Sequence, residues 1–218
     1  MSKPLFANRK EAAAQLLPLL QQYRTRTDAV VLGLPRGGVV IAAELARGLK
    51  LPLDVIVVKK VNPPHNDEFA VGAVTEDNES FFDWTMNEDV CGPQQLFQKT
   101  IEKKNEEVRT RSALYRKILP MRDLSGKVAI IADDGIATGA TMCVAIKSAR
   151  KRGAMKVVIA VPVSPQDSLA RVRGEADEVA CPHVVDFFAA VGQCYEEFPQ
   201  VEDEGVASIL KNYSLKQT

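Results

Sequence analysis

The sequence predicts an α/β fold, in which a doubly wound, mostly parallel sheet is flanked by helices. Four apolar runs of strand length recur along the 218 residues, at 29–34, 53–60, 128–132 and 156–163. Three of these runs are followed by segments of good helix propensity, and this alternation is typical of parallel sheets covered on both faces. Hydrophobic residues make up 46% of the chain, which is enough for the full core of one domain.

The first quarter of the chain predicts a helix and then a strand–helix–strand sequence. A helix is expected over residues 8–22, with Asn8 as its cap and Pro18 as a kink or an end. Its apolar face carries Ala12, Leu16, Leu19 and Leu20. The strand 29–34, a helix over 39–49 and the strand 53–60 follow.

Residues 61–89 interrupt this pattern. Asn62, Pro63 and Pro64 break secondary structure, and residues 69–74 and 80–84 predict a hairpin with its turn at 76–79. A long polar helix is expected over 93–119. Its narrow apolar stripe consists of Phe97, Ile101, Val108, Tyr115 and Leu119. A solvated face suits the basic residues near its end, which are Arg109, Arg111, Arg116 and Lys117.

The second half of the chain returns to alternating strands and helices. The strand 128–132 precedes a helix that ends at Gly153, a natural stop. The strand 156–163, a helix from Pro165 to about Gly174 and a short edge strand at 178–180 come next. A closing helix is expected over 202–211.

Composition and charge exclude several classes of protein. Lys and Arg together number 28, as do Asp and Glu, and this balance argues against a dedicated nucleic-acid surface. No apolar run approaches the roughly 18 residues of a membrane span. Cys91, Cys143, Cys181 and Cys194 have no C-x-x-C spacing, so we expect reduced thiols and a cytoplasmic location.

The chain is organised around residues 128–141, which read VAIIADDGIATGAT. A buried strand ends in Asp133 and Asp134, and a loop of small and hydroxyl residues then leads into a helix. Backbone N–H groups at a helix start bind phosphate, and small residues let the backbone approach the anion. Carboxylates do not suit a phosphate, but they accept hydrogen bonds from sugar hydroxyls or bind a metal ion. A ribose 5'-phosphate satisfies both halves of this motif.

A second strand–loop–helix unit contains Pro35-Arg36-Gly37-Gly38. The two glycines after a cation make backbone N–H groups available to an anion, although a plain turn between strand and helix is the alternative. Lys59 and Lys60 end the strand 53–60 on the side where open α/β sheets bind ligands. Either lysine is a candidate for pyrophosphate, with a solvated edge position as the alternative.

The motif at 128–141 resembles the phosphoribosyl diphosphate (PRPP) binding motif of type I phosphoribosyltransferases, including purine- and hypoxanthine-using members. The resemblance extends over most of the chain, with the Arg36 loop in the position of the pyrophosphate loop. It implies a single domain over 1–218, with a lid insertion at 62–120 and a small C-terminal hood at 181–218. It also implies a cis peptide bond at Pro35–Arg36 and a lid that includes His65, Asn66, Asp67 and Glu68.

The resemblance assigns roles to individual residues. It implies catalytic roles for Asp133, Asp134 and Arg36, with Asp133 and Asp134 also near Mg²⁺, directly or through water. The residues expected to bind PRPP are Gly135, Ala137, Thr138, Gly139, Ala140, Thr141, Gly37, Gly38, Lys59 and Lys60. Phe187, Phe188 and Tyr195 are candidates for stacking on a base, with packing of the hood as the alternative.

The implied reaction is transfer of 5-phosphoribosyl from PRPP to a nitrogen base or related acceptor, with release of pyrophosphate. The implied partners are PRPP, a nucleobase-like acceptor and a second copy of the chain in a homodimer. A PRPP-binding regulator or sensor without catalysis is the alternative, because one fold serves many functions.

Overall fold

A parallel sheet of five strands forms the centre of the computed structural model, which describes residues 4–62, 71–77, 79–82, 94–186 and 190–215. The strands run in the order β2 (Leu53–Val55), β1 (Ala29–Gly33), β6 (Val128–Ala132), β7 (Lys156–Ala160) and β9 (Glu178–Ala180). All four pairings are parallel, with Val31 opposite Ile130 and Ile130 opposite Val158. β6, which carries the acidic pair, is therefore the central strand.

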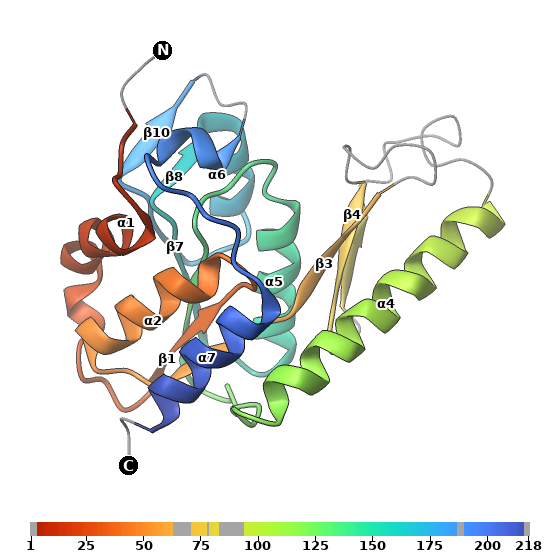
Figure 1. The fold of residues 1–218 in the computed structure, drawn as a ribbon, viewed down its shortest axis with the longest axis horizontal. Coiled ribbons are helices and arrows are strands. Elements are labelled where there is room, and N and C mark those ends of the chain that lie inside the picture. Colours follow the sequence, from red (N-terminus) through yellow and green to blue (C-terminus); the bar gives the residue numbers. More distant parts are fainter. Residues whose placement is uncertain (1–3, 63–70, 78, 83–93, 187–189, 216–218) are drawn as a thin grey trace.

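Helices cover both faces of this sheet, which confirms the predicted fold class (Figure 1). The helices α1 (Arg9–Leu16), α2 (Gly38–Leu49) and α7 (Asp203–Ser214) pack on one face. On the other face lie α5 (Ala140–Lys151) and α6 (Gln166–Arg173). Successive side chains of β1 alternate between the two cores, with Val31 in the first and Val30 and Leu32 in the second.

The apolar run 53–60 forms two strands and not the single strand that the sequence predicts. After β2, the Ile56 N–H still donates to the Gly33 carbonyl at 3.1 Å, and the chain then leaves the central sheet. β3 (Val58–Val61) pairs antiparallel with β4 (Gly72–Thr75), which pairs with β5 (Ser80–Phe82). Val55 and Val58, on the two sides of the break, are both buried, so the hydrophobic pattern of the sequence does not reveal it.

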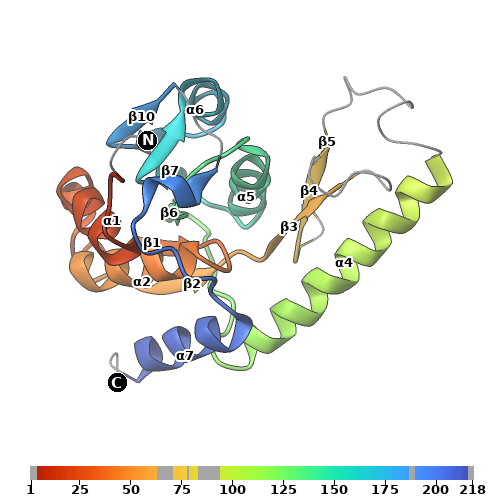
Figure 2. The same cartoon turned by 45° about the horizontal axis from the view of Figure 1, so that its top comes forward.

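The helix α4 (Gln94–Arg116) and the antiparallel sheet form an arm that projects from one side of the molecule (Figure 2). The predicted stripe is confirmed, because Phe97, Val108, Tyr115 and Leu119 are buried and Ile101 packs against them. α4 contacts β3, β4 and α7.

Two basic residues of α4, Arg111 and Arg116, do not lie on the solvated face that was expected, because their side chains are only 16% and 15% exposed. The Arg116 guanidinium binds Glu76 of the arm at 2.7 Å and also binds Asp54 of β2. The Asp54 carboxylate is fully buried and also accepts from Arg152 at 2.9 Å. Burial of Asp54 requires such partners, and this network ties the arm to the central sheet.

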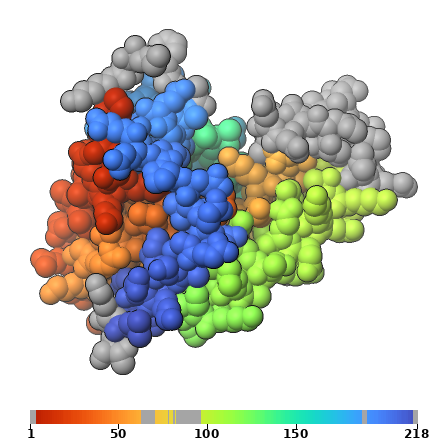
Figure 3. All heavy atoms as spheres, in the orientation of Figure 1, coloured from red at the N-terminus to blue at the C-terminus, as the bar shows by residue number. Residues whose placement is uncertain are grey.

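The N-terminal segment pairs with the chain near the C-terminus. Phe6 and Tyr195 form a parallel bridge, and the Glu196 N–H donates to the Phe6 carbonyl at 2.9 Å. The two segments lie against each other on the surface in Figure 3. Asn8 caps α1 as predicted, accepting hydrogen bonds from the Lys10 and Glu11 N–H groups. At Pro18 the expected helix changes into a 3-10 helix, η1 (Leu17–Tyr23).

The run 156–163 is also divided. β8 (Val163–Pro165) leaves the central sheet after Pro162 and pairs with β10 (His183–Val185). A second 3-10 helix, η2 (Val191–Cys194), follows. Among the described helices, none is both long enough and apolar enough to cross a bilayer.

Candidate functional site

The acidic pair lies at the carboxyl end of the central strand, β6. Asp133 and Asp134 line a pocket whose wall also contains Lys60, Val191, residues 135–139, Thr141 and Met142. The Leu34 N–H donates to the Ala132 carbonyl at 3.0 Å, and this bond brings the end of β1 beside the acids. The carboxyl ends of two neighbouring parallel strands therefore place their following loops around one pocket.

Both carboxyl groups of the pair are held above their ordinary pKa. Burial raises the pKa of Asp133, and the neighbouring Asp134 charge raises it further. The Asp134 N–H, which donates to Asp133 Oδ1 at 2.8 Å, and the charge of Lys60 act in the opposite direction. Burial also raises the pKa of Asp134, against the lowering effect of Arg9. Two neighbouring buried carboxyl groups whose pKa values are raised in this way are typical of a functional site.

The sequence reasoning missed Arg9, which pairs with Asp134. Arg9 Nε lies 2.8 Å from Asp134 Oδ2, and the Arg9 residue is only 7% exposed. A signal was available, because Arg9 shares the buried helix face of Ala12, Ala13 and Leu16. A cation on that face in a first turn is opposed by the helix dipole, so it calls for a specific partner.

The Ile136 N–H donates to the Val163 carbonyl at 3.0 Å, but the loop that follows it has unpaired backbone N–H groups beside the pocket. Within the described part of the chain, the N–H groups of residues 137–142 donate to no protein acceptor. The carbonyl groups of Ala137 and Thr138 accept from α6, from Ser168 Oγ at 2.6 Å and from Arg171 Nη1 at 3.4 Å. In a trans peptide the C=O and the next N–H point in opposite directions, so the N–H groups of Thr138 and Gly139 point away from α6.

The last residue before α5 has the backbone conformation that this loop needs. Gly139 has φ +82°, in the left-handed region where glycine is preferred. The start of α5 adds three N–H groups that have no partner within the helix. Thr138 and Thr141 also line the pocket, and their hydroxyls can donate to an anion. These N–H groups and hydroxyls are the kind of donors that bind an anion such as phosphate.

The loop 35–38 lies directly against the acidic pair. The Pro35–Arg36 peptide bond is cis, as the resemblance implied. A Cβ atom on Gly38 would stand 2.7 Å from Asp133 Oδ1, so the backbone and the carboxylate are in close contact. The Arg36 guanidinium is bound by Glu202, with Nη1 and Oε2 2.5 Å apart.

The two lysines of β3 point to opposite faces of the arm, as alternate residues of a strand do. Lys60 is exposed and lines the pocket beside Asp133. Lys59 Nζ instead forms an ion pair with Glu107 of α4 at 2.9 Å. The structure therefore places Lys60 at the candidate site, whereas Lys59 serves the packing of the arm.

Only one candidate for base stacking can be placed. Phe187 and Phe188 lie outside the described residues, as do the expected lid residues 65–68. Tyr195 is buried between Phe6 and Phe198, with ring centroids 5.1 and 4.8 Å away, and its hydroxyl donates to the Asp134 carbonyl at 2.6 Å. This position is that of a packing residue and does not fit the stacking role expected for Tyr195.

The donor set suits a magnesium ion that is shared with a ligand. No group of three or more His, Cys, Asp or Glu side chains converges on one point among the described residues. Asp133 and Asp134 offer two carboxylates in an open pocket. Mg²⁺ commonly binds one or two carboxylates together with waters and substrate phosphates, so the residues present fit it in that way.

The doubly wound sheet, with an acidic pair beside an anion-binding loop, defines the class of an α/β ligand-binding domain. Comparison with known proteins gives its family: residues 5–198 match the model of the phosphoribosyl transferase domain, and the chain belongs to that family. The resemblance seen in the sequence is confirmed.

Individual relatives agree with this assignment. The chain is 43% identical over 210 residues to "Putative phosphoribosyl transferase Rv0571c" of Mycobacterium tuberculosis, and equally to its counterpart MT0597 in a second strain. These matches cover 94% of this chain but 46% of each relative, so the chain spans about half their length. The crystal structure of TT1426 from Thermus thermophilus is similar with a TM-score of 0.78 and 38% identity, covering 95% of this chain and 98% of that one.

Proposed function

We propose that this protein transfers 5-phosphoribosyl from PRPP to a nitrogen base or related acceptor and releases pyrophosphate. One observation carries the proposal: unpaired backbone N–H groups of residues 137–142 share a pocket with Asp133 and Asp134. Of the two halves of this pocket, one suits a 5'-phosphate and the other a pair of ribose hydroxyls. PRPP carries both groups on one ribose ring.

The remaining groups suit the pyrophosphate of the same molecule. The loop 35–38 abuts the acids and supplies backbone N–H groups and the Arg36 guanidinium. Lys60 adds a second cation at the wall of the pocket. When bound, Mg²⁺ would neutralise the charge of the leaving pyrophosphate, and Asp133 and Asp134 would hold it, directly or through water.

The chemistry assigned to the site is a substitution at the anomeric carbon. The bond from C1 to the pyrophosphate oxygen breaks, the bond from C1 to the acceptor nitrogen forms, and that nitrogen then loses its proton. Positive charge develops on the ribose in the transition state, and the fixed carboxylates of Asp133 and Asp134 stabilise it. The acids act without a covalent intermediate.

The test measures PRPP binding and turnover in the same preparation. PRPP affinity is determined by calorimetry with Mg²⁺, and pyrophosphate release is followed with a panel of hypoxanthine, guanine, xanthine, uracil and simple amines. The wild type should bind PRPP and release pyrophosphate with at least one acceptor. The double variant D133N/D134N should lose both PRPP binding and pyrophosphate release, because amide oxygens accept hydrogen bonds from ribose hydroxyls less strongly than carboxylates do.

The possible results distinguish a catalyst from a sensor and test the roles of the two acids. PRPP binding without turnover over the whole panel would indicate a sensor instead of a catalyst. Full binding and turnover by the double variant would refute the roles given to the two acids. Size-exclusion chromatography with light scattering on the same samples tests the homodimer that the family resemblance implies.

A further inference from the structure

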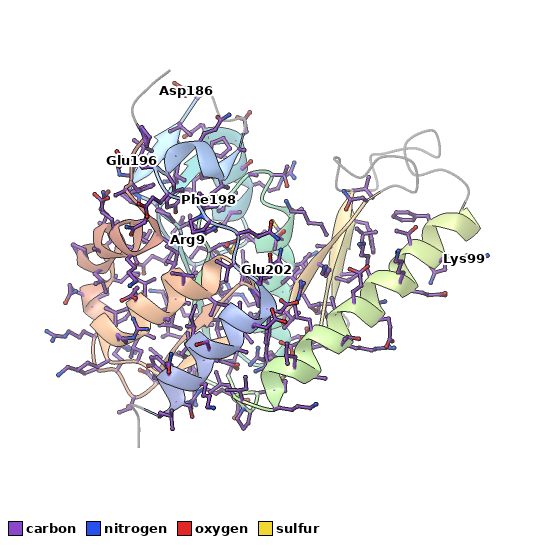
Figure 4. The ribbon with its side chains drawn as sticks, viewed as in Figure 1. Arg9, Lys99, Asp186, Glu196, Phe198 and Glu202 are labelled. Carbon is purple, nitrogen blue, oxygen red and sulfur yellow. The ribbon has the colours of Figure 1, made fainter. Side chains whose placement is uncertain are left out.

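Arg9 lies where four separate segments of the chain meet. Its Nε donates to Asp134 Oδ2 at 2.8 Å, and its Nη1 donates to the Pro199 carbonyl at 2.9 Å. Its guanidinium carbon stands 3.8 Å from the centroid of the Phe198 ring. Figure 4 shows Arg9 beside Phe198, between α1 and the chain that leads to Glu202. A Cβ atom on Gly37 would lie 3.1 Å from Arg9 Nε, so the loop 35–38 is also adjacent.

These contacts fix the guanidinium in one orientation. Two N–H groups have acceptors in different segments, and the flat face of the group rests on an aromatic ring. Arg9 is 7% exposed, so water does not compete strongly for these bonds. Charge-assisted hydrogen bonds of this kind are among the stronger interactions in proteins.

Arg9 does not reach the pocket itself. It stands behind Asp134, which lines the pocket, whereas the lining does not include Arg9. Oδ2 of Asp134 is bound by Arg9, so this bond fixes how the carboxylate is turned toward the pocket. The Tyr195 hydroxyl holds the Asp134 carbonyl at 2.6 Å, so the backbone of this acid is fixed from the same C-terminal segment.

We propose that Arg9 is a positioning residue for the transfer reaction, which aims the Asp134 carboxylate at the ribose hydroxyls of PRPP. This inference rests on the proposed function and deepens it. Arg9 acts through Asp134. Because it also binds the Pro199 carbonyl and packs on Phe198, it couples the position of the acidic pair to that of residues 195–199. The ribose half of the substrate depends on Arg9 more strongly than the pyrophosphate half, which also has the loop 35–38 and Lys60.

The experiment compares two ligands across four proteins. Wild type, R9M, R9K and K10M are titrated by calorimetry with PRPP and, separately, with inorganic pyrophosphate, each with Mg²⁺. K10M is the matched control, because it removes an exposed cation from the next position of the same helix. Thermal unfolding shows which variants are folded at the assay temperature.

R9M should bind PRPP roughly ten- to a hundredfold more weakly than the wild type, which is the factor that corresponds to one charge-assisted hydrogen bond. Pyrophosphate affinity should fall by a clearly smaller factor than PRPP affinity, and K10M should match the wild type for both ligands. R9K should recover only part of the loss, because a lysine lacks the planar set of N–H donors with which Arg9 binds Asp134 and the Pro199 carbonyl at once.

Other results would overturn the inference. A folded R9M with unchanged PRPP affinity would show that Asp134 needs no positioning by Arg9. An equal loss for PRPP and pyrophosphate would indicate general damage to the site. If R9M is unfolded, R9K is judged by the same two comparisons. Failure of the wild type to bind PRPP would refute the proposed function, and this inference with it.

Discussion

The Asp134 carboxylate lies so close to Gly37 that a Cβ atom on residue 37 would stand 1.9 Å from Oδ2. The backbone of Gly37 has φ −61°, which every residue can adopt, so contact alone excludes a side chain here. The carboxylate cannot move aside freely, because Arg9 holds Oδ2 at 2.8 Å. The two loops of the candidate site are therefore packed against each other.

G37A should consequently damage the site and the fold together. Overpacking of a close contact costs about 1–3 kcal/mol of the free energy of unfolding, and a displaced Asp134 should weaken PRPP binding at least about tenfold. Denaturant unfolding and calorimetry with PRPP measure the two effects. G174A is the control, because a Cβ atom there meets its nearest neighbour, the Arg171 carbonyl, at 3.4 Å. Equal behaviour of G37A and G174A would contradict this prediction.

The adjacent lysines of β3 should differ in function despite their shared chemistry. K60A should lower PRPP affinity several-fold and flatten its dependence on salt, because Lys60 lines the pocket. K59A should leave PRPP affinity unchanged and cost less than about 1 kcal/mol of stability, since its pair with Glu107 is partly exposed. Titrations at two salt concentrations compare the variants. A larger loss of affinity in K59A than in K60A would reverse the assignment.

Local patterns in the sequence predicted the central sheet and the stripe of α4, because each depends on periodic burial of side chains. The break after Val55 escaped prediction, since Val57 and Val58, which follow β2, are also buried. Hydrophobicity reports burial but not which sheet a strand joins.

The residues of the site also differ in whether a continuous stretch of sequence or packing between distant segments determines their position. The motif at 128–141 contains the acids and the anion loop within one continuous stretch, so the sequence alone was enough to identify it. Arg9 lies 125 positions from Asp134, and Arg116 lies 62 positions from Asp54. Their partners are set by packing between segments, which a single sequence does not display. The position of Tyr195 also depends on packing between distant segments. It was expected to stack on a base, but its hydroxyl donates to the Asp134 carbonyl and its ring packs against Phe198.

The orientation of the anion loop should depend on Ser168. Its hydroxyl donates to the Ala137 carbonyl at 2.6 Å and so turns the next N–H group away from α6. S168A removes one neutral hydrogen bond, worth about 0.5–1.5 kcal/mol, so PRPP and ribose 5-phosphate should bind about two- to tenfold more weakly. Pyrophosphate binding should not change. Q166A, at an exposed position of the same helix, is the control, and a loss equal to that of S168A would rule out this role.

The junction between the arm and α7 should be sensitive to acid through Asp203. Its carboxylate accepts from the Tyr115 hydroxyl at 2.6 Å and pairs with Arg111 at 3.0 Å. Burial raises the pKa of Asp203, but the hydrogen bond from Tyr115 and the charge of Arg111 outweigh it, so the pKa lies below its ordinary value. The ionised carboxylate therefore contributes stability above the pKa of the unfolded chain, and this contribution is lost as the pH falls through the folded pKa.

D203N should accordingly be less stable than the wild type at pH 7, by about 1–2 kcal/mol after allowance for partial exposure of the carboxylate. The difference should shrink as the pH falls below about 4, because the wild type then loses the same charge. Urea unfolding between pH 3 and pH 7 measures both curves, with D186N as an exposed control. A difference between D203N and the wild type that stays constant over this range would show that the Asp203 charge does not hold the arm to α7.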